Sequence, residues 1–344
     1  MTIDESMMKE ALKEARKGWG LTSPNPMVGA VVVRDGVIVG RGYHHGAGLP
    51  HAEPNALADA GENTFGATLY VTLEPCCTFG RTPPCTEAIK RAGIRRVVVG
   101  CTDCNPKHSG HGLAILREAG IDVISGICEK ECLEINAAFF WWISTGCPYV
   151  RLKMAMTLDG KIATANGDSK WITGETARRY VQKLRRGSDA VMVGGETVRK
   201  DDPELVVREP KGWKRQPARI VWTSKPSLPD GCKLLNGNGG PVELAKPVTT
   251  DEWKAFLNGL GDRGMMSLLM EGGGELAGCA LKAGIVNEID FFIAPKILGG
   301  RGSRPVVGWE NPLALKESLP LKEWRVRRIG DDLLVTASLD AQKD

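Results

Sequence analysis

The sequence lacks the features that mark membrane, secreted and nucleic-acid-binding proteins. Its longest apolar run, residues 137–143, is far shorter than the about 20 residues that cross a bilayer. The N-terminus is acidic and has no basic start before an apolar core, so it does not read as a signal peptide. The formal net charge is only +4, which gives no sign of a nucleic-acid footprint. We therefore expect neither a membrane nor a nucleic-acid partner.

A disulfide framework is not expected either, although the chain has ten cysteines. Such frameworks are typical of short secreted proteins, whereas these cysteines are spread over 344 residues. We expect a cytoplasmic protein in which some thiols are free and some bind metal.

Hydrophobic patterning predicts two α/β domains, residues 1–146 and 147–344. In the first domain helices and strands alternate, which favours a three-layer α/β/α arrangement. Its predicted helices cover residues 7–15, 52–60, 86–92 and 113–119, and its predicted strands cover 28–33, 37–39, 68–73, 97–99 and 122–124. In the second domain we expect a threonine-capped helix at 176–186, a helix at 276–283, surface loops at 209–217 and 229–241, and strands at 149–154, 190–193, 219–222, 267–270, 288–293 and 333–337.

One histidine, one glutamate and two cysteines of the first domain have the order expected of a catalytic zinc site. His51, Cys76 and Cys85 offer one imidazole and two thiolates, which leaves the fourth tetrahedral position for water. Glu53, two residues after the histidine, would move a proton between that water and a leaving amine. Zinc deaminases use this arrangement, although their second cysteine usually follows the first more closely.

The spacing between the two cysteines suggests where each would lie. Cys76 would end a strand and Cys85 would open the next helix, where free amide groups favour a thiolate. Cys77 competes with Cys76, but adjacent side chains of an extended segment point opposite ways, and the preceding proline favours Cys76. Residues 80–82 are expected to form a lip over the pocket.

Motifs along nearly the whole chain resemble the RibD family of bifunctional riboflavin-biosynthesis enzymes. They are PNPMVG (24–29), HAE (51–53), TLEPC (72–76) and GRTPPC (80–85), followed by KMAMTLDG (153–160), SKWIT (169–173), TVRKDDPEL (197–205) and EGGG (271–274). The resemblance implies a cytidine-deaminase-like domain followed by a dihydrofolate-reductase-like domain. It also implies Zn²⁺ and NADPH as cofactors and phosphoribosylaminopyrimidines as small-molecule substrates. The first domain would remove the 2-amino group of 2,5-diamino-6-(5-phosphoribosylamino)pyrimidin-4(3H)-one, and the second would reduce the ribosyl group of the resulting uracil to ribityl. We also expect a homo-oligomer.

Family positions carry over to individual residues of the second domain. Substrate would be bound by Ser169, Arg185, Leu205, Arg208 and Glu271. NADPH would be bound by Ala155, Trp171, Thr197, Asp201, Ser224, Gly273, Gly274, Glu275, Leu276, Ala277, Gly278 and Cys279. Lys153 and Asp201 are the candidates for polarising the sugar carbonyl or supplying a proton after hydride transfer.

Without the family resemblance, the residues of the two proposed sites also allow other interpretations. The glycines at 272–274 suit a phosphate, but they lack the spacing of a Rossmann fingerprint, and glycine clusters are more often plain turns. Cys77-Thr78-Phe79 and Cys104 depart from the family pattern near the first site, which concerns substrate contacts rather than metal ligands. A nucleoside or guanine deaminase fused to an unrelated reductase, a base-editing enzyme and a structural zinc module are the rival hypotheses.

Overall fold

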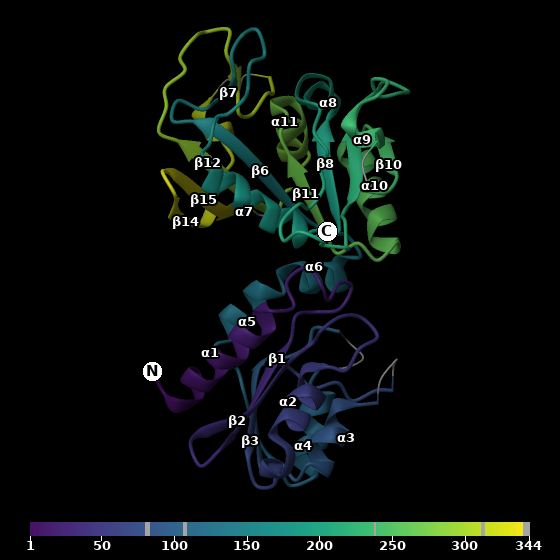
Figure 1. Cartoon of the computed structure of the whole chain (residues 1–344), viewed down its shortest axis with the longest axis vertical. Coiled ribbons are helices and arrows are strands. Elements are labelled where there is room, and N and C mark those ends of the chain that lie inside the picture. The colour runs from purple at the N-terminus through teal and green to yellow at the C-terminus, as the bar shows by residue number, and fades with distance from the viewer. Residues whose placement is uncertain (80–82, 106–108, 237–238, 311–313, 340–344) are drawn as a thin grey trace. The chain divides into compact units, whose positions relative to one another are not determined.

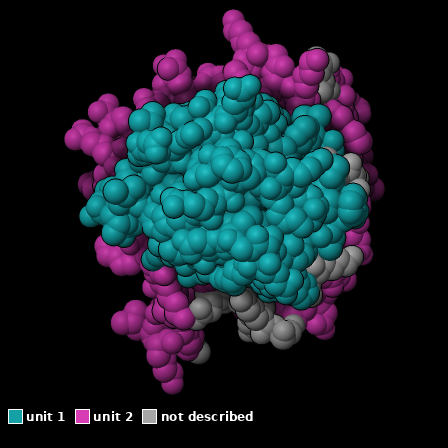
Figure 2. Space-filling view, turned by 90° about the horizontal axis from the view of Figure 1, so that it is seen from below, with its two compact units in different colours: residues 1–145 teal, residues 146–344 magenta. Residues whose placement is uncertain are grey.

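The computed structural model describes residues 1–79, 83–105, 109–236, 239–310 and 314–339. The chain divides into two compact units, Met1–Thr145 and Gly146–Asp344, which Figure 2 shows in different colours. The proposed lip at residues 80–82 lies outside the described residues. No helix in the described part of the chain has both the length and the apolar character to cross a membrane.

The first unit is a five-stranded sheet between two layers of helices (Figure 1). The strand order is β2-β1-β3-β4-β5, in which β3, β4 and β5 are parallel and β1 is antiparallel to both neighbours. The strands are β1 (Gly29–Arg34), β2 (Val37–Tyr43), β3 (Thr68–Leu73), β4 (Arg96–Cys101) and β5 (Asp122–Ser125). The helices are α1 (Ile3–Arg16), α2 (Ala52–Ala60), η1 (Gly61–Thr64), α3 (Cys85–Arg91), α4 (His111–Glu118), α5 (Glu129–Ile135) and α6 (Ala137–Thr145).

Alternation of side chains along the strands divides the core into two clusters. Val31 and Val98 face α1 and α5, whereas Val32 and Val97 face α2, α3 and α4. The two-residue turn between β1 and β2 has Asp35 at φ 50° and Gly36 at φ 78°, the left-handed conformations that a tight hairpin needs.

Two glycines of β2 bring the first site's helix into place. A Cβ on Gly40 would lie 2.3 Å from the carbonyl oxygen of Ala56, and one on Gly42 would lie 2.3 Å from its nitrogen. The alanines of α2, including Ala52 and Ala60, face this strand and are buried. Backbone contact between α2 and the sheet therefore fixes where the helix begins, and with it the first site.

The second unit has an eight-stranded sheet with helices on both faces. The order is β10-β9-β8-β11-β6-β12-β15-β14, parallel from β10 to β12 and antiparallel at β15 and β14. The strands are β6 (Tyr149–Thr157), β8 (Ala190–Gly194), β9 (Ala218–Trp222), β10 (Val242–Ala245), β11 (Ser267–Glu271), β12 (Glu288–Ala294), β14 (Lys322–Ile329) and β15 (Asp332–Ser338), while β7 (Lys161–Ala163) and β13 (Arg304–Pro305) pair separately.

Helices cover both faces of this sheet. They are α7 (Glu175–Arg186), α8 (Gly195–Asp201), α9 (Lys233–Asn236), α10 (Thr250–Asp262), α11 (Gly274–Lys282) and the short η2 (Leu315–Glu317). Apolar residues of α10 and α11 pack on one face, and those of α7, α8 and α9 pack on the other. The expected fold class, a three-layer α/β/α domain followed by a second α/β domain, is confirmed.

The structure corrects several local predictions. Helix α7 begins at Glu175 after Gly174, which makes no side-chain cap, so the expected threonine cap is wrong. Asp332 of β15 accepts the Gly174 N–H instead, at 2.8 Å. Within 229–241 the structure has the short helix α9.

Candidate active sites

The first candidate site lies where α2, the end of β3 and α3 meet. His51 is the residue before α2, Cys76 follows β3, and Cys85 is the first residue of α3. Their ligand atoms all lie within 4.8 Å of one another. In the described part of the chain this is the one group of at least three such residues, and it includes Cys76 rather than Cys77.

The distances within this group fit a zinc ion. Nδ1 of His51 lies 3.5 Å from Sγ of Cys76 and 3.4 Å from Sγ of Cys85. A tetrahedral zinc with bonds of about 2.1 Å to nitrogen and 2.3 Å to sulfur would separate such ligands by about 3.6 Å. The three residues therefore already have the spacing of three zinc ligands, with a fourth position left over.

The pKa values of the two thiols are shifted in opposite directions. A hydrogen bond from Cys85 and the nearby His51 lower the pKa of Cys76 to about 4. The Cys85 backbone N–H also donates to Cys76 Sγ, at 3.4 Å. The pKa of Cys85 is raised instead, first because its thiol donates to Cys76 and then because it is buried. A divalent cation would stabilise the thiolate form of both.

Glu53 is buried beside this group, with 3% of its surface exposed. Burial, with the negative charge of Cys76, raises its pKa to about 7. A carboxyl group with a pKa near neutrality can both take up and release a proton at physiological pH. Its place in the first turn of α2 brings it next to the three ligands without making it one of them.

Two further features of this site were not singled out from the sequence. His44 is buried, and its ring meets that of His51 edge-on at 5.2 Å. Its Nε2 lies 3.0 Å from Asn25 Nδ2, and its Nδ1 lies 3.1 Å from the Pro50 carbonyl oxygen. Burial lowers the pKa of His44, so the neutral ring with its proton on Nδ1 satisfies both contacts. The PNP motif at residues 24–26 was the sequence feature that could have pointed to Asn25 as part of the site.

The second of these features is the carboxylate of Glu74, which ties a loop to the ligand-bearing segment. It is buried and accepts three backbone N–H groups, from Asp103 at 3.2 Å and from Gly110 and Gly112 at 2.9 Å each. A Cβ on Gly112 would lie 2.2 Å from the carbonyl oxygen of Pro75, so α4 begins in direct contact with the residue before Cys76. No side-chain spacing in the sequence could have revealed this packing.

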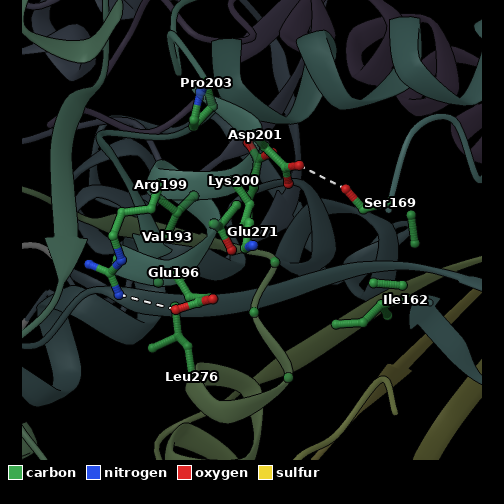
Figure 3. Close-up of a pocket in the computed structure, with 18 of the residues that line it drawn as sticks. Ile162, Ser169, Val193, Glu196, Arg199, Lys200, Asp201, Pro203, Glu271 and Leu276 are labelled. Atoms are coloured by element: carbon green, nitrogen blue, oxygen red, sulfur yellow. Dashed lines mark hydrogen bonds and ion pairs between the residues drawn. The ribbon is translucent and has the colours of Figure 1, made fainter. Parts of the chain in front are cut away.

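The second candidate site is a cavity of about 870 Å³ in the second unit. It lies at the carboxyl ends of β6, β8, β9 and β11, where parallel sheets commonly bind ligands. Gly272 and Gly273 have φ of 72° and 89°, which side chains rarely adopt, so this turn into α11 needs glycine. Figure 3 shows residues from β11, α8 and the segment near Ser169 converging on the cavity.

Most of the residues expected to bind substrate or NADPH line this cavity. The lining includes all five expected substrate residues, and it includes Ala155, Trp171, Thr197, Asp201, Ser224, Gly273, Gly274, Glu275 and Leu276. Ala277, Gly278 and Cys279 are not among the described residues that line it. They follow the first turn of α11, where Gly278 packs on the backbone of Gly308 and Cys279 Sγ accepts a hydrogen bond from Trp253 Nε1 at 3.4 Å.

A buried ion pair stands at the floor of the cavity. Arg185 Nε and Nη2 donate to the two carboxylate oxygens of Glu271 at 2.6 and 2.9 Å. Burial alone would raise the pKa of Glu271, but Arg185 holds it below its usual value. Burial also lowers the pKa of Lys153, whose ammonium lies 5.8 Å from the ring centre of Phe292. This floor can bind an anion or supply a proton.

Polar contacts also link the two sides of the cavity mouth. Ser169 donates to Asp201 Oδ1 at 2.7 Å, the contact dashed in Figure 3. Lys170 donates to the Asp201 carbonyl oxygen at 2.6 Å. Trp171 is 64% exposed and lies 4.6 Å from the Arg178 guanidinium, which leaves part of its ring available to a planar ligand.

The fold and the two sites together define a class of protein, a zinc-type deaminase joined to a reductase with a parallel sheet. Residues 1–101 match the family model described as the cytidine and deoxycytidylate deaminase zinc-binding region, and residues 148–335 match that of the RibD C-terminal domain. The chain belongs to the RibD family of riboflavin biosynthesis proteins and is a bifunctional deaminase and reductase that uses zinc and NADPH.

Individual relatives match over nearly their full length. The riboflavin biosynthesis protein RibD of Aquifex aeolicus is 45% identical over 97% of this chain and 98% of its own, and that of Escherichia coli K12 is 41% identical over 96% and 98%. Form 1 of Acinetobacter baumannii RibD superposes with a TM-score of 0.89, at 38% identity over 98% of this chain and 99% of its own. The diaminohydroxyphosphoribosylaminopyrimidine deaminase/5-amino-6-(5-phosphoribosylamino)uracil reductase of Thermotoga maritima gives a TM-score of 0.87, at 36% identity over 98% and 99%. The resemblance seen in the sequence is confirmed.

Proposed function

We propose that residues 1–146 deaminate 2,5-diamino-6-(5-phosphoribosylamino)pyrimidin-4(3H)-one and that residues 147–344 then reduce the ribosyl group of 5-amino-6-(5-phosphoribosylamino)uracil to ribityl. The Thermotoga maritima protein, whose name states both activities, supports these substrates. The observation that carries the proposal is the juxtaposition of His51, Cys76 and Cys85 with the buried carboxyl group of Glu53.

In the deaminase site we assign His51, Cys76 and Cys85 as the zinc ligands and Glu53 as the acid/base. Zinc, when bound, lowers the pKa of water so that a nucleophile is available near neutral pH. Glu53 takes a proton at its carboxylate from the attacking water and delivers it to the leaving amine. The water oxygen remains on C2 and the amino group departs as ammonia. Burial raises the pKa of Glu53, which favours a carboxyl group that can take up and release this proton.

In the reductase site we assign Ser169, Arg185, Leu205, Arg208 and Glu271 to substrate, and the residues named above from Ala155 to Cys279 to the cofactor. NADPH, when bound, supplies the hydride. The planar guanidinium of Arg208, at the cavity edge, suits a phosphate group. Lys153 and Asp201 both line the cavity and are the candidates for polarising the sugar carbonyl or supplying the proton.

We also propose that the chain is a homo-oligomer and works in the cytoplasm. The last strand of the sheet, β14, has seven of its eight residues exposed, with Trp324 at 66% and Val326 at 47%. An edge strand with exposed apolar side chains is a ready surface for pairing with another chain. None of the ten cysteines, all of which the structure describes, is in a disulfide, which fits a reducing compartment. Sedimentation of the purified protein as a monomer would contradict the first of these proposals.

The substitution Glu53→Gln tests the deaminase assignment. Glutamine keeps the shape of the side chain but cannot carry the proton, so we expect deamination to fall by about a thousandfold or more. Zinc content, by elemental analysis, and reduction of a pre-deaminated substrate should stay unchanged. Mass spectrometry of the pyrimidine, with and without NADPH, would follow both steps. Deamination at the normal rate would remove Glu53 from its role, and activity only on free cytidine or guanine would favour the rival deaminases.

A further inference from the structure

The segment between α8 and β9, residues 202–208, has the burial pattern of a strand. Leu205 and Val207 are buried in the core, whereas Arg208 is exposed. The described residues nevertheless contain no strand that pairs with it. Leu205 has φ 56°, a conformation that leucine rarely adopts, so the surrounding structure must hold it.

Side chains take the place of the missing partner strand. Gln216 Oε1 accepts the Val207 N–H at 2.7 Å, and Gln216 Nε2 donates to the Val207 carbonyl oxygen at 3.1 Å. One amide side chain thus forms both of the bonds that a neighbouring strand would form. The same Nε2 donates to the Trp213 carbonyl oxygen at 3.0 Å, which fixes the amide orientation.

The flanking backbone groups are held in the same way. Gln182 of α7, only 7% exposed, accepts the Arg208 N–H at 2.8 Å. The buried Arg219 of β9 donates to the Glu204 carbonyl oxygen at 3.3 Å. Gln182 and Gln216 therefore hold two consecutive residues of the segment, and the second of these is Arg208.

The side chain of Arg208 is held only weakly by interactions of its own. The Arg208 side chain is 62% exposed, and its ion pair with Glu204 is at 3.4 Å and exposed as well. Such a pair contributes little to fixing an orientation. The direction in which Arg208 meets the cavity is therefore set mainly by its backbone, which Gln182 and Gln216 fix.

We propose that Gln216 and Gln182 are positioning residues for the reductase, which present Arg208 to the phosphate group of the sugar substrate. The proposal rests on the function proposed above, in which Arg208 binds that phosphate. Neither glutamine lines the cavity. Each acts through the backbone of 207 and 208, so its effect should appear in substrate affinity rather than in the hydride-transfer step.

The substitution Gln216→Met tests this, because methionine keeps the length of the side chain without its hydrogen bonds. We expect the KM for the phosphorylated substrate to rise about tenfold, with kcat and the KM for NADPH within about twofold of the unchanged chain. Gln182→Met should act in the same direction. With a substrate that lacks the phosphate, KM should not respond to either change.

A matched control and a double-mutant cycle separate positioning from general damage. Asn287 is also a buried amide that accepts a backbone N–H, from Val150 at 2.7 Å, and it does not line the cavity. Asn287→Leu should lower stability without changing KM. In an Arg208→Ala background, Gln216→Met should change KM no further.

The outcomes distinguish the two proposals. If Arg208→Ala leaves the KM unchanged, Arg208 does not bind the phosphate. The proposal that Gln182 and Gln216 position Arg208 for the phosphate is then overturned as well. If Arg208→Ala raises the KM but Gln216→Met does not, or if the two effects add in full, only the positioning proposal is overturned. A rise in KM that is equal for substrates with and without phosphate would also overturn it.

Discussion

The two candidate sites are built in opposite ways. The first gathers three ligands and a proton carrier from residues 51–85, at the ends of two helices and one strand. The second spreads its lining from Lys153 to Gly308, over the ends of four parallel strands and several loops. In the first, the chemistry lies in a few side chains that must touch one ion. In the second, it lies in a shape that holds a large cofactor, and many contacts share the binding. The first should therefore fail completely when one component is lost, and the second by degrees.

Removal of the metal is the change with the largest expected effect on one site alone. Dialysis against a chelator should reduce deamination by about a thousandfold or more, because the nucleophile is then ordinary water. Reduction of a pre-deaminated substrate should continue, since the described residues of the second unit contain no group of metal ligands. Both activities are followed in the same sample, and added zinc should restore the first. Parallel loss of both would break the comparison.

Loss of the buried cation at the floor of the second site comes next. Arg185 and Glu271 are 13% and 7% exposed, so Arg185→Met leaves a buried carboxylate without its partner. Removing one partner of such a pair costs about 3–5 kcal/mol. We expect that loss in the denaturant unfolding of the second unit, together with loss of reduction, while deamination persists.

A second substitution separates the structural part of this effect from the functional part. In Arg185→Met/Glu271→Leu the buried charge is gone, so stability should return to within about 1–2 kcal/mol of the original. Reduction should stay absent, because both proposed substrate contacts are missing. Recovered activity in the double variant would show that the pair serves only the fold.

Sequence patterns correctly predicted the features of the fold that depend on residues close together in the chain. The helix at 52–60 and the strand at 68–73 have the predicted bounds, because burial on one or two faces imposes a clear period. The grouping of His51 with Cys76 and Cys85 follows from short connections between those elements. Signals were also missed. Helix α10 begins with a capping box of Thr249 and Glu252, which the sequence displays openly.

Other features could not have been predicted from local patterns. The N–H of Gly174, the residue before α7, is accepted by Asp332, 158 residues away in the chain. Segment 202–208 alternates like a strand, yet glutamine side chains replace its partner. Strand β14 is exposed on both faces, so the alternation of Trp324 and Val326 with arginines does not mark a buried face. In each case a distant residue or an exposed surface determines the local structure, so the nearby sequence does not predict it.

The smallest expected effect concerns a partly exposed ion pair of the first unit, which contrasts with the buried pair of the second. Arg96 of β4 donates to both carboxylate oxygens of Asp4 in α1, at 3.0 and 2.8 Å, and Tyr70 donates to one of them at 2.7 Å. The hydrogen bonds from Arg96 hold the pKa of Asp4 below its usual value. A carboxyl group whose pKa is lowered on folding stabilises the fold above its unfolded pKa, and this contribution is lost as the pH falls through the folded value.

Asp4→Asn should therefore destabilise the first unit by about 1 kcal/mol at pH 7. The difference from the unchanged chain should shrink as the pH falls below the ordinary aspartate pKa of about 3.9 and on through the lowered folded value, as Asp4 itself becomes protonated. Unfolding by urea at a series of pH values measures this. Asp35→Asn is the matched control, because that carboxylate is 94% exposed and should show little difference at any pH. A gap for Asp4→Asn that stayed constant down to pH 2 would mean that the ionised carboxylate contributes nothing, and that the pair matters only as packing between α1 and β4.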